Sequence, residues 1–143
     1  MSATVNLTTI SAEAAHAAVG AAVAHARSLG INVAAVVIDS TGQMAAFLRT
    51  SGAPFHSSGI AEDKAFTAAS FKVPSDAMFG GISGNPALLA GIPSRPRIAM
   101  FGGGLPVKAG NAVIGAVGVS GGSEAQDVEC ARAGLAAVAA MAG

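Results

Sequence analysis

The sequence contains no tryptophan and no tyrosine, and only 6 of its 143 residues are phenylalanine. So little aromatic surface leaves few side chains on which nucleic-acid bases can stack. Charge is scarce as well, because charged residues make up 11% of the chain, against about 25% in an average soluble domain. The eight basic residues equal the eight acidic ones, so the chain lacks the basic surface that attracts nucleic acids. We therefore expect no nucleic-acid partner.

The one cysteine, Cys130, cannot form a disulfide within the chain. A single cysteine fits a reducing compartment and excludes a zinc site built from cysteines. The motifs of phosphate-binding loops, dinucleotide-binding turns and zinc proteases are also missing. Residues 1–10 contain no basic residue and no apolar core, unlike a secretory signal. These absences predict a cytoplasmic protein without a metal site.

Long uninterrupted hydrophobic runs are missing too, although hydrophobic residues make up 52% of the chain. Residues 133–143 carry no charge but are too few for a bilayer span, which takes about 20 apolar residues in a helix. Residues 77–94 are also uncharged, but glycine and proline interrupt them. We expect no membrane-spanning segment. The low charge instead favours a homo-oligomer, a dimer or larger, because subunits cover apolar faces on one another.

The length fits a single domain over residues 1–143. Apolar spacing and capping residues predict helices at Ser11–Leu29, Gly59–Lys72, Ser75–Phe79 and Ser123–Met141. The expected caps are Ser11, Ser57 or Ser58, and Ser123, which is expected to form a capping box with Gln126. Residues 74–96 are otherwise expected to be irregular. Apolar and β-branched runs between turn residues predict strands at Asn32–Asp39, Gln43–Arg49, Arg97–Phe101, Leu105–Lys108 and Ala112–Val119. Because hairpins join these strands, we predict an α+β fold with helices flanking one mainly antiparallel five-stranded sheet.

The three histidines are candidate ligands. His16 and His25 share the first expected helix, where nine steps of about 100° place them on opposite sides. One helix therefore cannot aim both at one metal ion, and each is either a surface or subunit-contact residue or a single axial haem ligand. His56 precedes the second helix, in a kind of loop that often carries function. A solvated loop histidine and a functional one both fit this position.

Two cations are candidates for binding an anion. Lys64 lies in a partly apolar stripe of the second helix, so its ammonium must pair, extend to water or have a lowered pKa. Arg49 ends a strand beside a loop, where a guanidinium can bind a carboxylate through two hydrogen bonds. The run Gly102-Gly103-Gly104 permits either a tight bend or close approach of the backbone to a ligand. We expect Arg49 and Lys64 to meet at a hollow that holds a small anionic ligand.

A set of short motifs follows one order along nearly the whole chain. They are Val36-Val37-Ile38-Asp39 with Gly42, Phe47-Leu48-Arg49, Gly52-Ala53-Pro54, Ala61-Glu62-Asp63-Lys64-Ala65-Phe66-Thr67-Ala68, Phe101-Gly102-Gly103-Gly104-Leu105-Pro106-Val107, and Val113 to Gly122 with Gln126-Asp127. In this order they resemble the GlcG/HbpS-like family, which includes the C-terminal domain of PduO-type proteins. The glycine-rich strands and the Lys-Ala-Phe-Thr-Ala helix are specific only in combination.

The resemblance implies a profilin-like fold that assembles as dimers or larger oligomers, and it implies haem as a cofactor. A histidine of the first helix matches as haem ligand, here His16 or alternatively His25. Arg49, Lys64 and Gly103-Gly104 match motif positions and are expected to line a recurrent pocket. The adenosyltransferase activity of PduO-type proteins belongs to a separate domain, so the resemblance does not extend to that activity.

We therefore predict a small-ligand-binding protein whose ligand is haem. The alternative is a catabolic enzyme of the tautomerase, isomerase or hydratase kind that acts on a small carboxylate or carbonyl compound. In that enzyme Arg49 binds the anion, and Lys64 or His56 transfers protons. A third alternative is an accessory protein whose partner is another subunit or enzyme.

Overall fold

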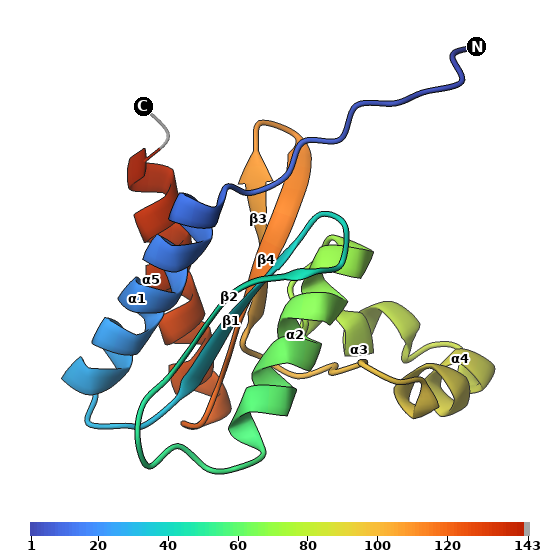
Figure 1. Cartoon of the computed structure of the whole chain (residues 1–143). Coiled ribbons are helices and arrows are strands. Elements are labelled where there is room, and N and C mark those ends of the chain that lie inside the picture. Colours follow the sequence, from blue (N-terminus) through green and yellow to red (C-terminus); the bar gives the residue numbers. More distant parts are fainter. Residues whose placement is uncertain (142–143) are drawn as a thin grey trace.

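Residues 1–141, described by a computed structural model, form one sheet with helices on both of its faces (Figure 1). The sheet contains β1 (Ala34–Asp39), β2 (Met44–Arg49), β3 (Gly104–Ala109) and β4 (Ala112–Ser120), in the spatial order β2-β1-β4-β3. All three pairings are antiparallel. The predicted α+β class and the antiparallel sheet are confirmed, but the sheet has four strands and not five.

The predicted strand that does not form is Arg97–Phe101. The side chain of Thr67 forms hydrogen bonds with the backbone of this segment. Its Oγ1 donates to the Arg97 carbonyl at 3.1 Å and accepts from the Ala99 N–H at 3.0 Å. Arg97 also has a left-handed backbone, with φ of 63°, which does not occur in a regular strand. The segment is therefore held to α2 (Ser57–Phe71) instead of pairing with a strand.

The two helices on one face of the sheet begin at the predicted caps. α1 (Ala12–Ser28) follows Ser11, whose Oγ accepts a backbone N–H from the first turn. α5 (Glu124–Met141) follows Ser123, which forms the predicted capping box with Gln126 through hydrogen bonds of 3.0 and 3.2 Å. Each cap satisfies N–H groups that have no partner inside the helix, which fixes where the helix starts.

Two expectations for the middle of the chain are wrong. The residue before α2 is His56, whose side chain forms no capping hydrogen bond, whereas Ser57 or Ser58 was the expected cap. Residues 74–96 are not mostly irregular, because they contain α3 (Ala77–Ile82), α4 (Pro86–Gly91) and a short 3-10 helix (Ile92–Ser94). Asn85 caps α4 through its side chain and proline occupies the first helical position, so a start signal was present in the sequence.

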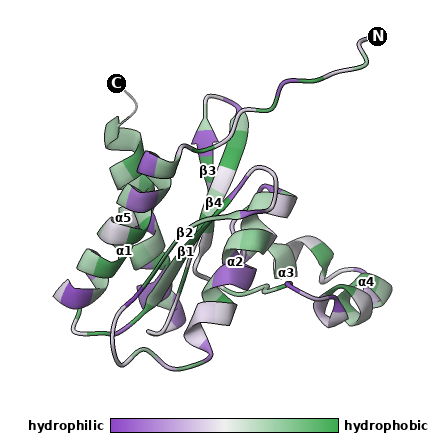
Figure 2. Ribbon diagram, in the orientation of Figure 1, coloured by the Kyte–Doolittle hydropathy of each residue, from purple (hydrophilic) through white to green (hydrophobic). Residues whose placement is uncertain are grey.

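The sheet separates two apolar layers (Figure 1). Alternate residues of the strands, such as Val37 and Val119, pack with α1 and α5 in the larger core. Val36 and Ile38 point to the other face and pack against α2. Figure 2 shows hydrophobic residues along much of β4 and a hydrophilic stretch near the tip of β3. Among the described helices, none combines the length and apolar character needed to cross a bilayer.

Glycine lets α2 lie directly on the sheet. A Cβ atom at Gly118 of β4 would overlap the Ala61 carbonyl oxygen and come within 2.7 Å of the Ala65 amide nitrogen, both backbone atoms of α2. Backbone atoms cannot move aside as a flexible side chain can. Gly118 therefore sets the distance between helix and sheet, and so the place of every side chain that α2 presents to β4.

We predict that Gly118→Ala lowers the free energy of unfolding by about 3 kcal/mol, because overpacking of this kind forces backbone shifts. The measurement is urea denaturation followed by circular dichroism. The matched control is Gly59→Ala on α2, where an added Cβ meets nothing within 4 Å, and which is expected to be neutral or stabilising by up to about 1 kcal/mol. Equal midpoints for the two variants would contradict this account of the packing.

Candidate functional site

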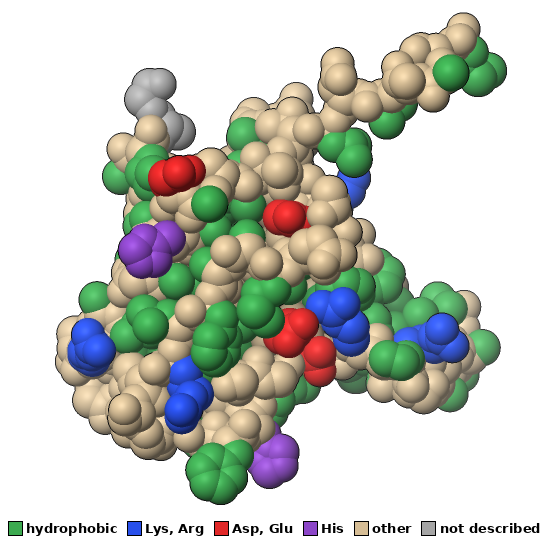
Figure 3. Space-filling model, viewed as in Figure 1, with side chains coloured by type: hydrophobic (Ala, Val, Ile, Leu, Met, Phe, Trp, Pro, Cys, Tyr) green, Lys and Arg blue, Asp and Glu red, His purple; other side chains and the backbone are tan. Residues whose placement is uncertain are grey.

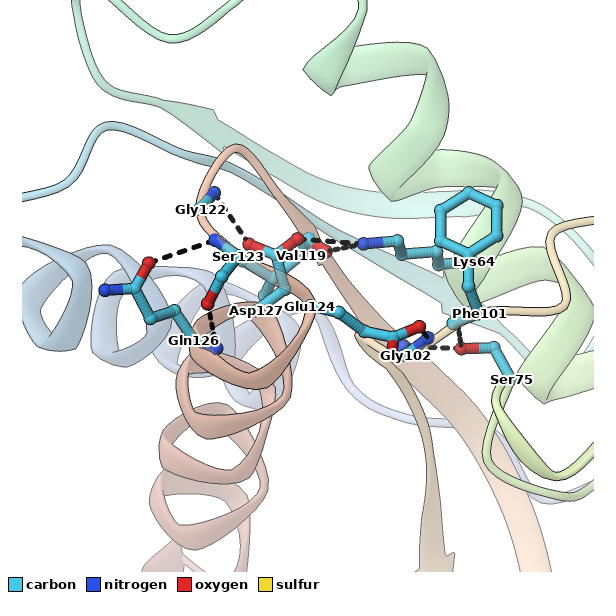
Figure 4. Close-up of polar contacts among 11 residues, drawn as sticks. Lys64, Ser75, Phe101, Gly102, Val119, Gly122, Ser123, Glu124, Gln126 and Asp127 are labelled. Atoms are coloured by element: carbon cyan, nitrogen blue, oxygen red, sulfur yellow. Dashed lines mark hydrogen bonds and ion pairs between the residues drawn. The ribbon is translucent and has the colours of Figure 1, made fainter.

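Lys64 lies at the centre of a buried polar cluster (Figure 4). Its side chain is 2% exposed, and its Nζ donates to the Val119 carbonyl at 2.8 Å and to Asp127 Oδ2 at 3.0 Å. The sequence left three alternatives for this lysine, and the structure shows the one in which its ammonium pairs with an acidic side chain. Lys64 belongs to α2 and Asp127 to α5, so the contact joins helices from opposite faces of the sheet.

Asp127 is held by more than the lysine. Its Oδ1 accepts the Gly122 backbone N–H at 2.9 Å, at the start of α5. Burial raises the pKa of the Asp127 carboxyl by removing water from the charged form, while the Lys64 ammonium and the Gly122 N–H act in the opposite direction. Asp127 was not predicted from the sequence as the partner of Lys64. The available signal was the lysine itself, since a buried ammonium requires a counter-charge.

The glycine run Gly102-Gly103-Gly104 packs against this cluster. A Cβ atom at Gly103 would lie 2.5 Å from the Val119 carbonyl oxygen and 2.7 Å from Lys64 Nζ, and Gly103 has φ of +128°. A Cβ atom at Gly104 would overlap the Lys64 backbone carbonyl. The structure thus brings Gly103, Gly104 and Lys64 together, and the glycines leave room for the lysine side chain and backbone.

Hydrogen bonds fix the rest of the bend. The Gly102 N–H donates to Glu124 Oε2 at 2.8 Å, and Ser75 Oγ accepts the Gly104 N–H at 2.9 Å while donating to the Phe101 carbonyl at 2.6 Å. The Phe101 ring stands 5.2 Å from Lys64 Nζ, where its face attracts the cation. These N–H groups already have partners, so the bend is organised around the protein's own groups.

The other predicted site residues lie elsewhere. Arg49 is exposed at the end of β2, two strands away from β4, whose Val119 carbonyl binds the lysine. His56 is exposed at the start of α2. The structure therefore does not bring Arg49 and Lys64 to a common hollow, and each of the two residues has a different environment.

The two histidines of α1 differ in their contacts. His25 Nε2 lies 2.9 Å from Glu129 Oε2 of α5, so it joins the two helices at the surface. His16 is exposed, and its imidazole makes no hydrogen bond or ion pair with any residue of 1–141. Within that range, no group of three or more metal-binding side chains comes together. His16 is therefore available as a single ligand.

Four of the cavities on the described surface are lined by none of the predicted site residues. The most polar, about 370 Å³, is bordered by the turn after β1, by Ser70 of α2 and by Arg97. Arg97 stacks on the Phe66 ring at 3.6 Å and pairs with Glu62 at 3.2 Å. Sequence reasoning missed Arg97, because a positive φ and a contact made by stacking leave no pattern in the local sequence.

We predict that Asp127→Asn lowers the free energy of unfolding by about 3–5 kcal/mol, because it leaves the buried Lys64 ammonium without a counter-charge. The measurement is chemical denaturation. The matched control on the same helix is Glu129→Gln, which removes only an exposed pair and is expected to cost less than about 1 kcal/mol. The double variant Lys64→Met with Asp127→Leu should recover most of the loss, and a loss for Asp127→Asn no larger than the control's would refute the assignment.

We also predict that Cys130 does not react with thiol reagents in the folded protein. Burial, with smaller contributions from the charges of Asp127 and Glu129, raises the pKa of the Cys130 thiol to about 11. Below that pH the thiol keeps its proton, and the thiolate is the reactive form. Ellman's reagent at pH 8 should label the native protein slowly and the denatured protein stoichiometrically. Rapid labelling of the native protein would disprove the prediction.

Comparison with known proteins places these features in a family. The sequence model for "Haem degrading protein HbpS-like" matches residues 10–136. Corrinoid adenosyltransferase PduO of Citrobacter freundii is 30% identical over 125 residues, which are 86% of this chain but only 37% of that protein's length. A 15.0 kDa protein encoded between dhaT and dhaS in Citrobacter freundii is 37% identical over 105 residues, which cover 71% of this chain and 74% of its own.

Solved structures agree with the sequence comparison. The crystal structure of a double mutant of Streptomyces reticuli HbpS has a TM-score of 0.84 and 34% identity, and covers 93% of this chain and 89% of that one. The crystal structure of a PduOC:heme complex has a TM-score of 0.83 and 28% identity, and covers 91% of this chain and 95% of that one. The chain therefore belongs to the HbpS-like family, as its ordered motifs implied.

Proposed function

We propose that this protein binds haem and that His16 is an axial ligand of the iron. The observation that carries the proposal is an exposed imidazole on α1 without a partner among residues 1–141. A neutral imidazole nitrogen is a common ligand of haem iron. His25 is less suited, because its Nε2 is already engaged by Glu129.

Two relatives support haem as the ligand. The family is described as haem degrading, and the PduOC structure was solved as a haem complex. Each statement concerns those proteins, and the identity to PduOC is 28%. The proposal for this chain therefore depends on whether its own residues fit the cofactor.

The helix surface next to His16 leaves space for a flat ligand. Gly20 lies one turn further along α1 on the same side, and an added Cβ there would meet nothing within 4 Å. A macrocycle can therefore approach the helix surface without meeting a side chain at that position. Haem would supply the redox chemistry of its iron, and the role of this chain is to hold the cofactor through the His16 imidazole.

A single chain leaves such a ligand uncovered. His16 is exposed and lines none of these four cavities, so it lies on an open face of the described chain. A second copy can supply the opposite wall, because the commonest homo-oligomers bring equivalent surfaces together about a two-fold axis. We therefore propose a homo-oligomer as the haem-binding form, and the scarcity of charge in the chain is consistent with it.

The enzyme alternative has less support. It requires Arg49, Lys64 and His56 around one small carboxylate or carbonyl compound. Arg49 and His56 are exposed on separate elements, and Lys64 is buried against Asp127. No observation favours a shared substrate site for these three residues, so we argue only the haem proposal further.

The test is titration of the purified protein with hemin, followed through the Soret band. The wild type is expected to give a saturable Soret shift, and His16→Ala is expected to weaken binding at least about tenfold, or about 1.4 kcal/mol. His25→Ala and His56→Ala are matched controls that remove an imidazole elsewhere and should bind like the wild type. No Soret shift in the wild type, or an unchanged titration for His16→Ala, would overturn the proposal.

A further inference from the structure

The first nine residues form an extended segment that belongs to no helix or strand of the chain described (Figure 1). The segment is anchored at its end, where the Ile10 N–H donates to the Ile114 carbonyl at 2.9 Å and Thr9 Oγ1 accepts the Ser40 N–H at 3.0 Å. Beyond this anchor it runs away from the sheet, with Val5 82% exposed and Leu7 72% exposed. Its backbone forms no hydrogen bond to any strand of the sheet before that anchor.

The composition of this segment is that of a strand. Val5 and Leu7 alternate with Thr4, Asn6 and Thr8, so one side is apolar and the other polar. It is rich in β-branched residues and carries no charged side chain. A lone extended strand has no partners for its backbone groups, so a sequence of this kind is stable as a strand only when it pairs with another.

The sheet has two edges, and β2 is the unprotected one. At the other edge, β3 contains Pro106, which has no N–H to donate, and Lys108, whose charge discourages pairing. β2 has no proline and no charge before its last residue, Arg49. Met44, Phe47 and Leu48 of β2 are each more than a third exposed. Figure 3 shows hydrophobic side chains gathered over this part of the surface.

The pairing between β1 and β2 shows which backbone groups of β2 are open. The Thr50 N–H donates to the Val33 carbonyl at 3.0 Å, so these two residues form a hydrogen-bonded pair. Because such pairs alternate along antiparallel strands, Leu48 turns its backbone groups toward β1, while Phe47 and Arg49 turn theirs to the open edge. A further strand can therefore pair with Phe47 and Arg49.

We propose that residues 2–8 of one copy pair as an additional strand with the β2 edge of a second copy. Addition of an extended segment to an open sheet edge is a general mode of recognition. The uncharged, alternating segment fits an edge with exposed apolar side chains, and the exchange is reciprocal in a two-fold dimer. The fifth strand of each sheet is then contributed by the partner.

Cross-linking between two variants that each carry one added cysteine tests the pairing. An affinity-tagged Leu7→Cys chain is mixed with an untagged Phe47→Cys or Leu48→Cys chain under mild oxidation, and the mixed disulfide is counted on a denaturing gel. The native Cys130 is buried and does not compete. We expect at least about fivefold more mixed disulfide with one of the β2 variants than with the control Lys108→Cys at the other edge. No excess over the control overturns the proposal.

The native mass gives a second, independent readout. Deletion of residues 2–8 should lower the mass measured by light scattering about twofold, or to a smaller assembly if dimers associate further. Phe47→Pro should do the same, since it removes only an outward N–H and leaves the β1 ladder intact; its thermal melt checks that it folds. An unchanged mass in either folded variant, or a monomeric wild type, overturns the proposal. All samples are free of haem, so the outcome does not depend on haem binding.

Discussion

The buried contact between the Lys64 ammonium and the Asp127 carboxylate ties the two helical layers of this domain to each other. Lys64 comes from α2, on one face of the sheet, and Asp127 from α5, on the other. The lysine reaches its partner past the end of β4, where it also binds the Val119 carbonyl. Two helices that otherwise pack against opposite faces are thereby fixed relative to each other and to the sheet.

This contact explains why glycine is concentrated in the segments around it. The lysine side chain needs the space that a Cβ at Gly103 would fill, and its backbone needs the space beside Gly104. On β4, Gly118 lets the same helix approach closely enough for the lysine to reach across. Gly103 and Gly104 were recognised in the sequence as positions of a tight bend or close approach, whereas Gly118 was not. What approaches them is the protein's own helix.

The sequence predicted helix starts that depend on hydrogen bonds between residues only a few positions apart. The caps at Ser11 and Ser123 satisfy N–H groups three residues away, and both were identified correctly. Two of the errors involve partners that are distant in the sequence. Thr67, which prevents the strand at Arg97–Phe101, lies 30 residues before Arg97, and Asp127 lies 63 residues after Lys64. Local spacing carries no information on such pairs.

The same limit applies to the candidate site. The apolar stripe around Lys64 indicated a lysine in need of a partner, but it did not say whether the partner was a ligand or another side chain. Arg49, which was expected at the same hollow, is exposed at the end of β2, whereas Lys64 is buried against Asp127. Position along a strand or helix does not reveal whether a charged side chain reaches solvent or pairs inside the protein.

Because the buried polar side chains already have hydrogen-bond partners, we look for the functional groups on the surface of the molecule. Within residues 1–141, Ser40 Oγ is the one buried side-chain polar atom that lacks a hydrogen-bond partner. The described interior therefore offers almost no free side-chain donor or acceptor for a ligand. Free groups on the described surface include the His16 imidazole on an outer helix face and the backbone of an open strand edge. Charged groups are costly to bury without partners, so a surface with few charges suits contact with a flat apolar cofactor or with another copy of the chain.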